Sequence, residues 1–270
     1  MLATAPASAQ DLTALETTLR TGTAEQKRDA LFQIRNLRSE IASRIAVPSL
    51  NDTDPLVRAT AAAAVTFLPK PEAIAVLTPL LNDKDAFVRK EAAYALGKVE
   101  SPDSAAPLLA LVDCEKDLEV KAAAAFALGY TGNPSALAQL TKILNDRPKE
   151  ETEFLRRSAA RSIGQIAQTL RSGNANAVTP QSFLPENLKD LSTGSNPGAH
   201  FNAPIKTLET VLRSSKEADD TRREAAFALG SIGSGDSVTV LQTASTSSDP
   251  YLLEIAREAL AKIANTNPAN

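Results

Sequence analysis

The stretch Asp85–Gly97, DAFVRKEAAYALG, decides the fold, because its pattern returns one repeat later as Asp117–Gly129, DLEVKAAAAFALG. The two stretches share an Asp, a Val, a basic residue, paired Ala, an aromatic residue and a final Ala-Leu-Gly. Self-similarity at a fixed period is the signature of a repeat architecture. With the Val position as the register, the repeats are separated by 31, 31, 32, 35, 66 and 31 residues and are marked by Gln26, Val57, Val88, Val120, Leu155, Thr221 and Leu252.

Each repeat is predicted to be a pair of helices. A shorter apolar segment precedes the register blocks, as at 72–81, and a Pro, Gly or Ser/Asp/Asn break precedes that segment. The dipeptide Asp54-Pro55 is typical of a helix start, with Asp as the N-cap and Pro at the first helical position. Apolar residues then recur at +0, +4, +7, +8 and +11 from the register, which is a stripe of helical period. Strand patterns are scarce and alanine is abundant, so the chain is predicted to be all-α.

The Asp-x-x-Val-Arg/Lys-x-x-Ala-Ala-x-Ala-Leu-Gly blocks at 85–97 and 117–129 resemble the HEAT repeat family, and specifically the HEAT-like repeats of phycobilisome lyase subunits. The resemblance implies a right-handed α-solenoid of about seven stacked helix pairs. The repeat spacing divides the chain into a leader at 1–10, repeats 1–5 at 11–170, an insertion at 171–203 and repeats 6–7 at 204–270. Because such arrays serve scaffolds, lyase subunits and enzymes alike, the resemblance does not choose a function.

Composition argues against most catalytic and metal-binding chemistry. The 29 Lys+Arg against 32 Asp+Glu give a net charge of −3, which offers no basis for nucleic-acid binding. A single Cys and a single His exclude a disulfide framework and a multi-histidine metal site. Cys114 falls in a turn with acidic neighbours and His200 in a loop, so neither is expected to be catalytic. No apolar run has the length of a membrane span. We therefore expect no catalytic residue, no metal and no cofactor.

A column of basic residues follows the register position and consists of Lys27, Arg58, Arg89, Lys121, Arg156 and Arg222. Each is predicted to lie in the first turn of its helix, where the helix dipole disfavours a cation. The expected partners are the acids three residues before the register, which would bridge to the adjacent repeat as a ladder: Asp54, Asp85 and Asp117. We interpret this ladder as structural, with partner binding as the alternative.

Positions +2 and +6 from the register lie off the apolar stripe and are candidates for a surface ridge. Basic and aromatic residues stand there, among them Lys90, Tyr94, Phe126, Arg157, Arg161, Arg223 and Phe227. Basic residues alternating with aromatic ones along a concave face would suit an extended peptide or an acidic partner. Alternatively, the aromatic residues seal the seams between repeats and the charges are merely solvated.

The separation of 66 residues between Leu155 and Thr221 holds one period and an insertion at 171–203, whose ends are rich in Ser, Asn, Gly and Pro. Residues 180–191 within it can form a short amphipathic helix with Phe183, Leu184, Leu188 and Leu191 on one side. Insertions in repeat arrays commonly map to binding faces, so Phe183 and Leu188 join the candidate partner contacts. A neutral cover over an inter-repeat seam is the alternative.

Residues 1–10 are interpreted as a disordered leader or the remnant of a signal peptide. The Ala-x-Ala before Gln10 resembles a secretory cleavage region, although the stretch lacks a basic n-region and a long apolar segment. Export to the periplasm is slightly favoured over a cytoplasmic location. The single Cys is compatible with either compartment.

The leading functional hypothesis is a monomeric, non-catalytic protein–protein interaction scaffold. It would bind a protein or peptide partner through the concave helix face, through the 171–203 insertion, or through both. The resemblance implies one alternative, a bilin-lyase-like subunit or chaperone that acts on a partner protein. A di-iron hydroxylase of similar fold needs paired His and Glu ligands, and a DNA glycosylase needs a basic groove with stacking aromatics. One His and a pI near 5.4 argue against both.

Overall fold

A computed structural model describes residues 9–172 and 199–266 of the chain. Within these two ranges every regular element is helical and no strand occurs. The chain divides into two compact units, Met1–Ala127 and Leu128–Asn270. Phe183 and Leu188, with the rest of the predicted amphipathic helix, lie outside the described residues, as do residues 1–8 of the predicted leader.

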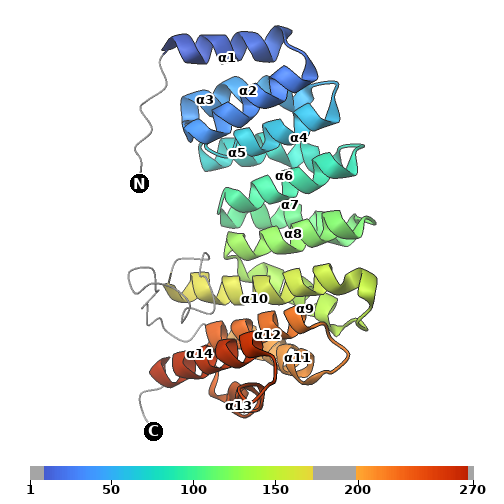
Figure 1. Cartoon of the computed structure of the whole chain (residues 1–270), viewed down its shortest axis with the longest axis vertical. Coiled ribbons are helices and arrows are strands. Elements are labelled where there is room, and N and C mark those ends of the chain that lie inside the picture. The colour runs from blue at the N-terminus through green and yellow to red at the C-terminus, as the bar shows by residue number, and fades with distance from the viewer. Residues whose placement is uncertain (1–8, 173–198, 267–270) are drawn as a thin grey trace. The chain divides into compact units, whose positions relative to one another are not determined.

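Unit 1 is a stack of helix pairs (Figure 1). Its elements are α1 (Ala9–Thr21), α2 (Ala24–Leu37), α3 (Glu40–Ala46), α4 (Pro55–Ala64), α5 (Lys70–Leu77), α6 (Ala86–Lys98), α7 (Ala105–Cys114) and most of α8 (Leu118–Thr131). Short 3-10 segments extend two of the first helices, at Val47–Asn51 and Thr78–Asn82. The second helices α2, α4 and α6 contact one another in sequence order, and the first helices α1, α3 and α5 each contact the second helix of their own pair.

Unit 2 continues the same pattern with longer second helices. It contains α9 (Leu137–Asn145), α10 (Glu153–Ser172), α11 (Asn202–Arg213), α12 (Asp219–Ile232), α13 (Val238–Ala244) and α14 (Pro250–Thr266). Contacts run from α10 to α12 to α14 among the second helices, and from α9 to α11 to α13 among the first. The described residues thus hold seven helix pairs, and the predicted all-α solenoid of HEAT-like pairs is confirmed.

The second helices begin where the sequence predicts. Asp54 has extended backbone dihedrals, its carboxylate accepts hydrogen bonds from the N–H groups of Leu56 and Val57, and Pro55 occupies the first helical position. Asp85 caps α6 in the same way. A side-chain cap is worth about 1 kcal/mol and fixes the residue at which the helix starts. These Asp residues therefore set the register of each second helix against its neighbours.

The core is aliphatic and small. The register residues Val57, Val88 and Val120 are buried, as are Leu96 and Leu128 at +8, which confirms the predicted stripe. Alanine fills most of the remaining buried positions on the second helices, so helix axes can approach closely. Aromatic rings have little room between such helices.

The glycine that closes each register block is required by this close approach. A Cβ on Gly97 of α6 would lie 2.9 Å from the Cα of Ala127 on α8, which is closer than real Cβ atoms come. In unit 2, a Cβ on Gly230 would lie 2.7 Å from the Cα of Ala259. These glycines are contact points between second helices and belong to no phosphate-binding loop.

Candidate interaction surface

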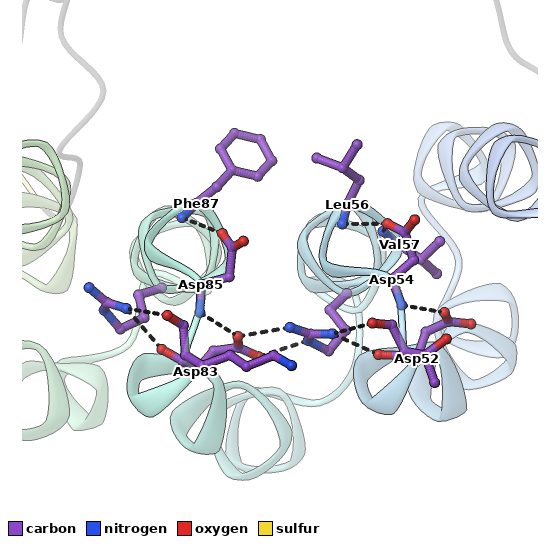
Figure 2. Close-up of polar contacts among 11 residues, drawn as sticks. Asp52, Asp54, Leu56, Val57, Asp83, Asp85 and Phe87 are labelled. Carbon is purple, nitrogen blue, oxygen red and sulfur yellow. Dashed lines mark hydrogen bonds and ion pairs between the residues drawn. The ribbon is translucent and has the colours of Figure 1, made fainter.

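Ion pairs link the second helices α2, α4 and α6 of unit 1 to the turn of the next repeat (Figure 2). The guanidinium of Arg58 donates to both carboxylate oxygens of Asp83, at 2.7 and 2.9 Å. Arg89 does the same with Glu115, at 2.7 and 3.1 Å, and Lys27 donates to Asp52 at 2.7 Å. Such paired geometry fixes both the distance and the orientation of the two repeats. The predicted ladder is therefore present.

The acids of the ladder differ from the predicted ones. The partners are Asp52, Asp83 and Glu115, two residues before the expected acids, because Asp54 and Asp85 are N-caps whose Oδ1 atoms accept helix N–H groups. Each ladder acid also accepts the backbone N–H of the residue two positions later, as when Asp83 accepts from Asp85 at 2.9 Å. In the motif Asp/Glu-x-Asp of these turns, the first acid thus forms the ion pair with the preceding repeat and the second acid caps the helix that follows.

The basic residue reaches back because helical side chains lean toward the N-terminus of their helix. Arg58 accordingly donates to the main-chain oxygens of Asp52 and Thr53 in the turn before its own helix, at 2.8 and 3.2 Å. Its guanidinium lowers the pKa of Asp83 below the ordinary value of an Asp, chiefly through their hydrogen bond. These contacts offset the unfavourable position of a cation in the first turn.

Unit 2 has a buried version of this link. Arg156 pairs with Glu217, and both side chains are almost fully buried, with 3% and 4% of their surface exposed. At the next repeat the link shifts by one residue, since Arg223 binds Asp249 at 2.8 Å. Arg222, the expected residue, instead donates to the main-chain oxygen of Leu212 at 3.3 Å.

The caps and the ladder place a pair of apolar side chains on the surface of unit 1. Leu56 and Phe87 stand one residue before the register and project side by side to the same side of the second helices (Figure 2). Their exposed fractions are 43% and 42%. We call these two residues the apolar row. Phe154 and Tyr251 occupy the same position in unit 2 and are also exposed.

Sequence reasoning missed this position although the signal was available. A helix turns by about 100° per residue, so the position before the register lies about 60° around the helix axis from position +2 and about 20° from position +6. All three positions therefore face the same side of the helix. An exposed Leu or Phe two residues after an Asp cap is therefore a ridge residue by the same criterion. The apolar row belongs with the predicted ridge.

In unit 1 the predicted ridge residues Lys90, Tyr94 and Phe126 are partly buried. Lys90 forms an ion pair with Glu119 at 2.9 Å and lies 5.4 Å from the centre of the Phe87 ring. Tyr94 and Phe126 meet edge to face, with 6.0 Å between ring centres. The ridge of unit 1 is thus largely apolar, and its one predicted cation is already paired.

In unit 2 the predicted ridge residues form a network of charges. Arg157 pairs with Asp220 at 2.9 Å, and Arg223 bonds to the same Asp220 at 2.6 Å. Arg161 pairs with Glu224 at 3.2 Å. Burial raises the pKa of Glu224, and the attraction of Arg161 only partly opposes that rise. The charges of this face are therefore engaged by neighbouring repeats, contrary to the interpretation that they are merely solvated.

Phe227 departs from the expectation of an exposed ridge residue, because only 2% of its surface is exposed. Its ring packs on α10 where Gly164 leaves room, since a Cβ there would lie 2.6 Å from the ring. Arg161 covers the ring at 4.6 Å from its centre. At this repeat the surface group is the arginine, and the aromatic residue seals the seam.

Aromatic residues are distributed unevenly over the described part of the chain. Only Phe201 and Phe227 are buried there. The others are exposed or partly buried, and most of them lie on second helices: Phe32, Phe67, Phe87, Tyr94, Phe126, Tyr130, Phe154 and Tyr251. Aromatic rings ordinarily supply much of a protein core. In this chain they are placed mainly on one side of the helix pairs.

The remaining chemistry-bearing residues form no cluster. Cys114 is an exposed free thiol at the end of α7, and His200 is exposed in a short 3-10 segment before α11. Within the described ranges no group of three or more His, Cys, Asp or Glu residues could hold a metal ion. No helix among the described residues is long and apolar enough to cross a membrane.

Stacked helix pairs joined by a capped and charge-linked turn define a helical-repeat protein of the α-solenoid class. The sequence profile of HEAT repeats matches residues 44–123, and that of the PBS lyase HEAT-like repeat matches residues 120–146 and 221–247. The chain therefore contains HEAT repeats at these residues, as the register blocks indicate. No curated protein sequence matches the chain significantly.

Solved structures with similar folds include natural and engineered repeat proteins. The complex of CpcE and CpcF of phycocyanin lyase from Nostoc sp. PCC7120 has a TM-score of 0.53 and 16% identity, with 99% of this chain and 97% of that chain covered. A mutant of Kap121p has a TM-score of 0.62 and 15% identity, with 90% of this chain and 26% of that chain covered. An engineered protein has a TM-score of 0.45 and 22% identity, with 95% and 97% covered. At these identities the likeness concerns the fold.

Proposed function

We propose that this HEAT-repeat protein is a non-catalytic scaffold that binds a protein or peptide partner through the exposed face of its second helices. The observation that carries the proposal is the placement of aromatic residues on that face while alanine fills the core. Exposed aromatic surface lowers solubility and contributes little to folding. Protein interfaces, by contrast, are enriched in Tyr, Phe and Trp, and a few such residues carry most of the binding energy.

The apolar row is the part of this face that is best suited to direct contact. Leu56 and Phe87 have their main chains fixed by the caps of α4 and α6, so little order is lost when a partner binds. The basic residues of the ridge are paired within the protein, which removes the earlier reason to expect an acidic partner. The partner contact is therefore proposed to be chiefly apolar.

Affinity capture from the native organism tests this proposal. The intact chain is compared with Leu56→Ser/Phe87→Ser and with Ile41→Ser, which changes an exposed apolar residue on a first helix. Captured proteins are quantified by mass spectrometry. We expect the double variant to lose a specific partner by more than tenfold, since two central anchors are removed, and Ile41→Ser to retain it.

Urea unfolding of all three proteins accompanies the capture, because exposed substitutions should leave stability within about 0.5 kcal/mol. Two results would overturn the proposal. One is that every captured protein is bound equally by the double variant. The other is that the Ile41 control loses the partner to the same extent while both variants remain folded.

A lyase-like subunit is the second candidate function, favoured by the PBS lyase HEAT-like repeats at 120–146 and 221–247. Such a subunit would act on a chromophore together with a partner protein. Incubating the purified chain with a bilin and recording its absorbance spectrum tests this candidate. A red-shifted, saturable spectrum at one bilin per chain would support it, and an unchanged spectrum would favour the scaffold.

A further inference from the structure

The helix α12 lacks the Asp cap with which α4, α6, α8 and α14 begin, and it also lacks the Thr cap of α2. Asp stands three residues before the register at Asp54, Asp85, Asp117 and Asp249, and each of these residues accepts N–H groups from its helix. At α12 the same position is Ala218, which has extended dihedrals and no side-chain acceptor. Without a side-chain cap, the first N–H donors of α12 lack the acceptor that these Asp residues supply, while Asp219 and Asp220 in its first turn offset the helix dipole.

A cavity of about 310 Å³ lies at this uncapped end. Its walls include Ala218 and Thr221 of the α12 start, and Arg156 with Glu217 from the buried ion pair. Lys149 and Lys216 are at its exposed margin. All lining residues belong to unit 2.

Thr221 is an independent sign of a polar site at this cavity. It occupies the register position, where most repeats have an apolar residue, such as Val57, Val88 and Val120 in unit 1. Its side chain is fully buried, and its hydroxyl has no hydrogen-bond partner among the described residues. A buried hydroxyl without a partner destabilises the folded state. A hydroxyl at this wall of the cavity can contribute one hydrogen bond to a bound group.

The hydrogen-bond donors at the inner end of the cavity, and not its net charge, favour an anionic group there. Arg156 and Glu217 neutralise each other and use each other's polar atoms. Glu150 and Glu153 line the outer part and are exposed to solvent, opposite Lys149 and Lys216, so the lining is neutral as a whole. The inner end then presents only donors, namely the free N–H groups of the first turn of α12 and the Thr221 hydroxyl.

We propose that this cavity binds a carboxylate, which takes the place of the Asp that caps α4, α6, α8 and α14. The carboxylate can belong to a free small acid or to a Glu, Asp or C-terminus of a partner. It would accept N–H groups of the first turn of α12 and the Thr221 hydroxyl, as Asp54 accepts N–H groups of α4. Carboxylates are stabilised at helix N-termini by these donors and by the dipole together. This site is independent of the proposed scaffold surface.

Amide NMR of the full chain tests the proposal with two probes: sodium acetate, and a peptide with blocked ends that contains one Glu. Each is titrated against sodium chloride at equal ionic strength. We expect saturable shifts of the Asp219, Asp220 and Thr221 amide signals and no change at Leu56, whose helix is already capped. Tighter binding of the peptide than of acetate by tenfold or more assigns the site to a partner side chain, and equal binding assigns it to small acids.

Two variants give opposite controls. Ala218→Asp supplies the missing cap from the chain itself, so it should raise the melting temperature and abolish the acetate and peptide shifts. Thr221→Val keeps the shape but removes the hydroxyl, and it should weaken binding at least threefold. The proposal is overturned if neither probe gives saturable shifts beyond those of chloride. It is also overturned if Ala218→Asp binds as tightly as the unchanged protein, or if ethylammonium, a cation, gives the saturable shifts instead.

Discussion

Replacing Arg156 by Met tests the buried ion pair at the start of α10. Its five N–H donors are all used, by Glu217 and by the main-chain oxygens of Ile143, Leu144 and Asp146. Met keeps most of the apolar stem, so the change removes charge and hydrogen bonds without creating a large cavity. Because Glu217 would remain buried and unpaired, we expect the free energy of unfolding to fall by about 3–5 kcal/mol.

Urea unfolding followed by helical circular dichroism measures this loss. The double variant Arg156→Met/Glu217→Leu should recover most of it, because replacing a buried ion pair by apolar residues is often neutral or stabilising. Arg44→Met is the matched control, since Arg44 pairs with Glu40 on the surface and such pairs are worth about 0–1 kcal/mol. If Arg156→Met unfolds within 1 kcal/mol of the unchanged protein, or if the two substitutions add independently, the pair does not hold this junction.

Four further predictions concern packing and pH. Gly97→Ala should destabilise the protein by about 1–3 kcal/mol in urea despite the better helix propensity of Ala, because its Cβ would press on Ala127; a stabilised variant would contradict the close approach of α6 and α8. Leu96→Ala should cost about 2–5 kcal/mol, and an unchanged urea midpoint would show that the helix register is misplaced. The pKa values of Asp83 and Glu115 are lowered in the folded protein, so the stabilisation that these carboxylates provide is complete above their unfolded pKa values of about 4. It is lost as the pH falls through their folded pKa values. Asp83→Asn should therefore lessen the loss of stability between pH 5 and pH 3. Glu224 has the opposite sign, because its raised pKa means that burial disfavours the ionised form in the folded protein relative to the unfolded chain. The advantage of Glu224→Gln should therefore be greatest at pH 7 and vanish below about pH 4, as measured by thermal melts.

The fold was predictable because the boundaries of each repeat are determined by residues close to one another in sequence. Asp54-Pro55 marks a helix start through capping and ring geometry, and the Val register with Leu at +8 marks the buried side. Gly97 at +9 marks a close helix contact. Each of these signals depends on interactions within one helix or with an identical neighbour, so one sequence contains enough information to place them.

The candidate surface was only partly predictable, because it depends on how two acids in one turn divide their roles. Asp54 and Asp52 differ by two residues, yet one caps its own helix and the other binds Lys27 of the preceding repeat. Charge alone does not tell which of the two acids forms the ion pair. The deciding factor is that the basic side chains of a helix lean toward its N-terminus and so reach one acid and not the other. The burial of Phe227 likewise depends on Gly164, more than 60 residues away in sequence.

Departures from the repeat rule are the most informative positions in such an array. Stability in a repeat protein comes from interfaces between neighbours, so a residue that conforms to the rule is explained by the stack. Ala218 and Thr221 each break the rule in a direction that costs stability, one by omitting a cap and the other by burying an unpaired hydroxyl. Both lie at one cavity, so a single bound group would offset both costs. Leu56 and Phe87 differ from Ala218 and Thr221, because the exposed apolar row neither adds to nor subtracts from the stability of the stack by much. The proposed partner would give the apolar row a role, whereas the proposed carboxylate would give the start of α12 its cap.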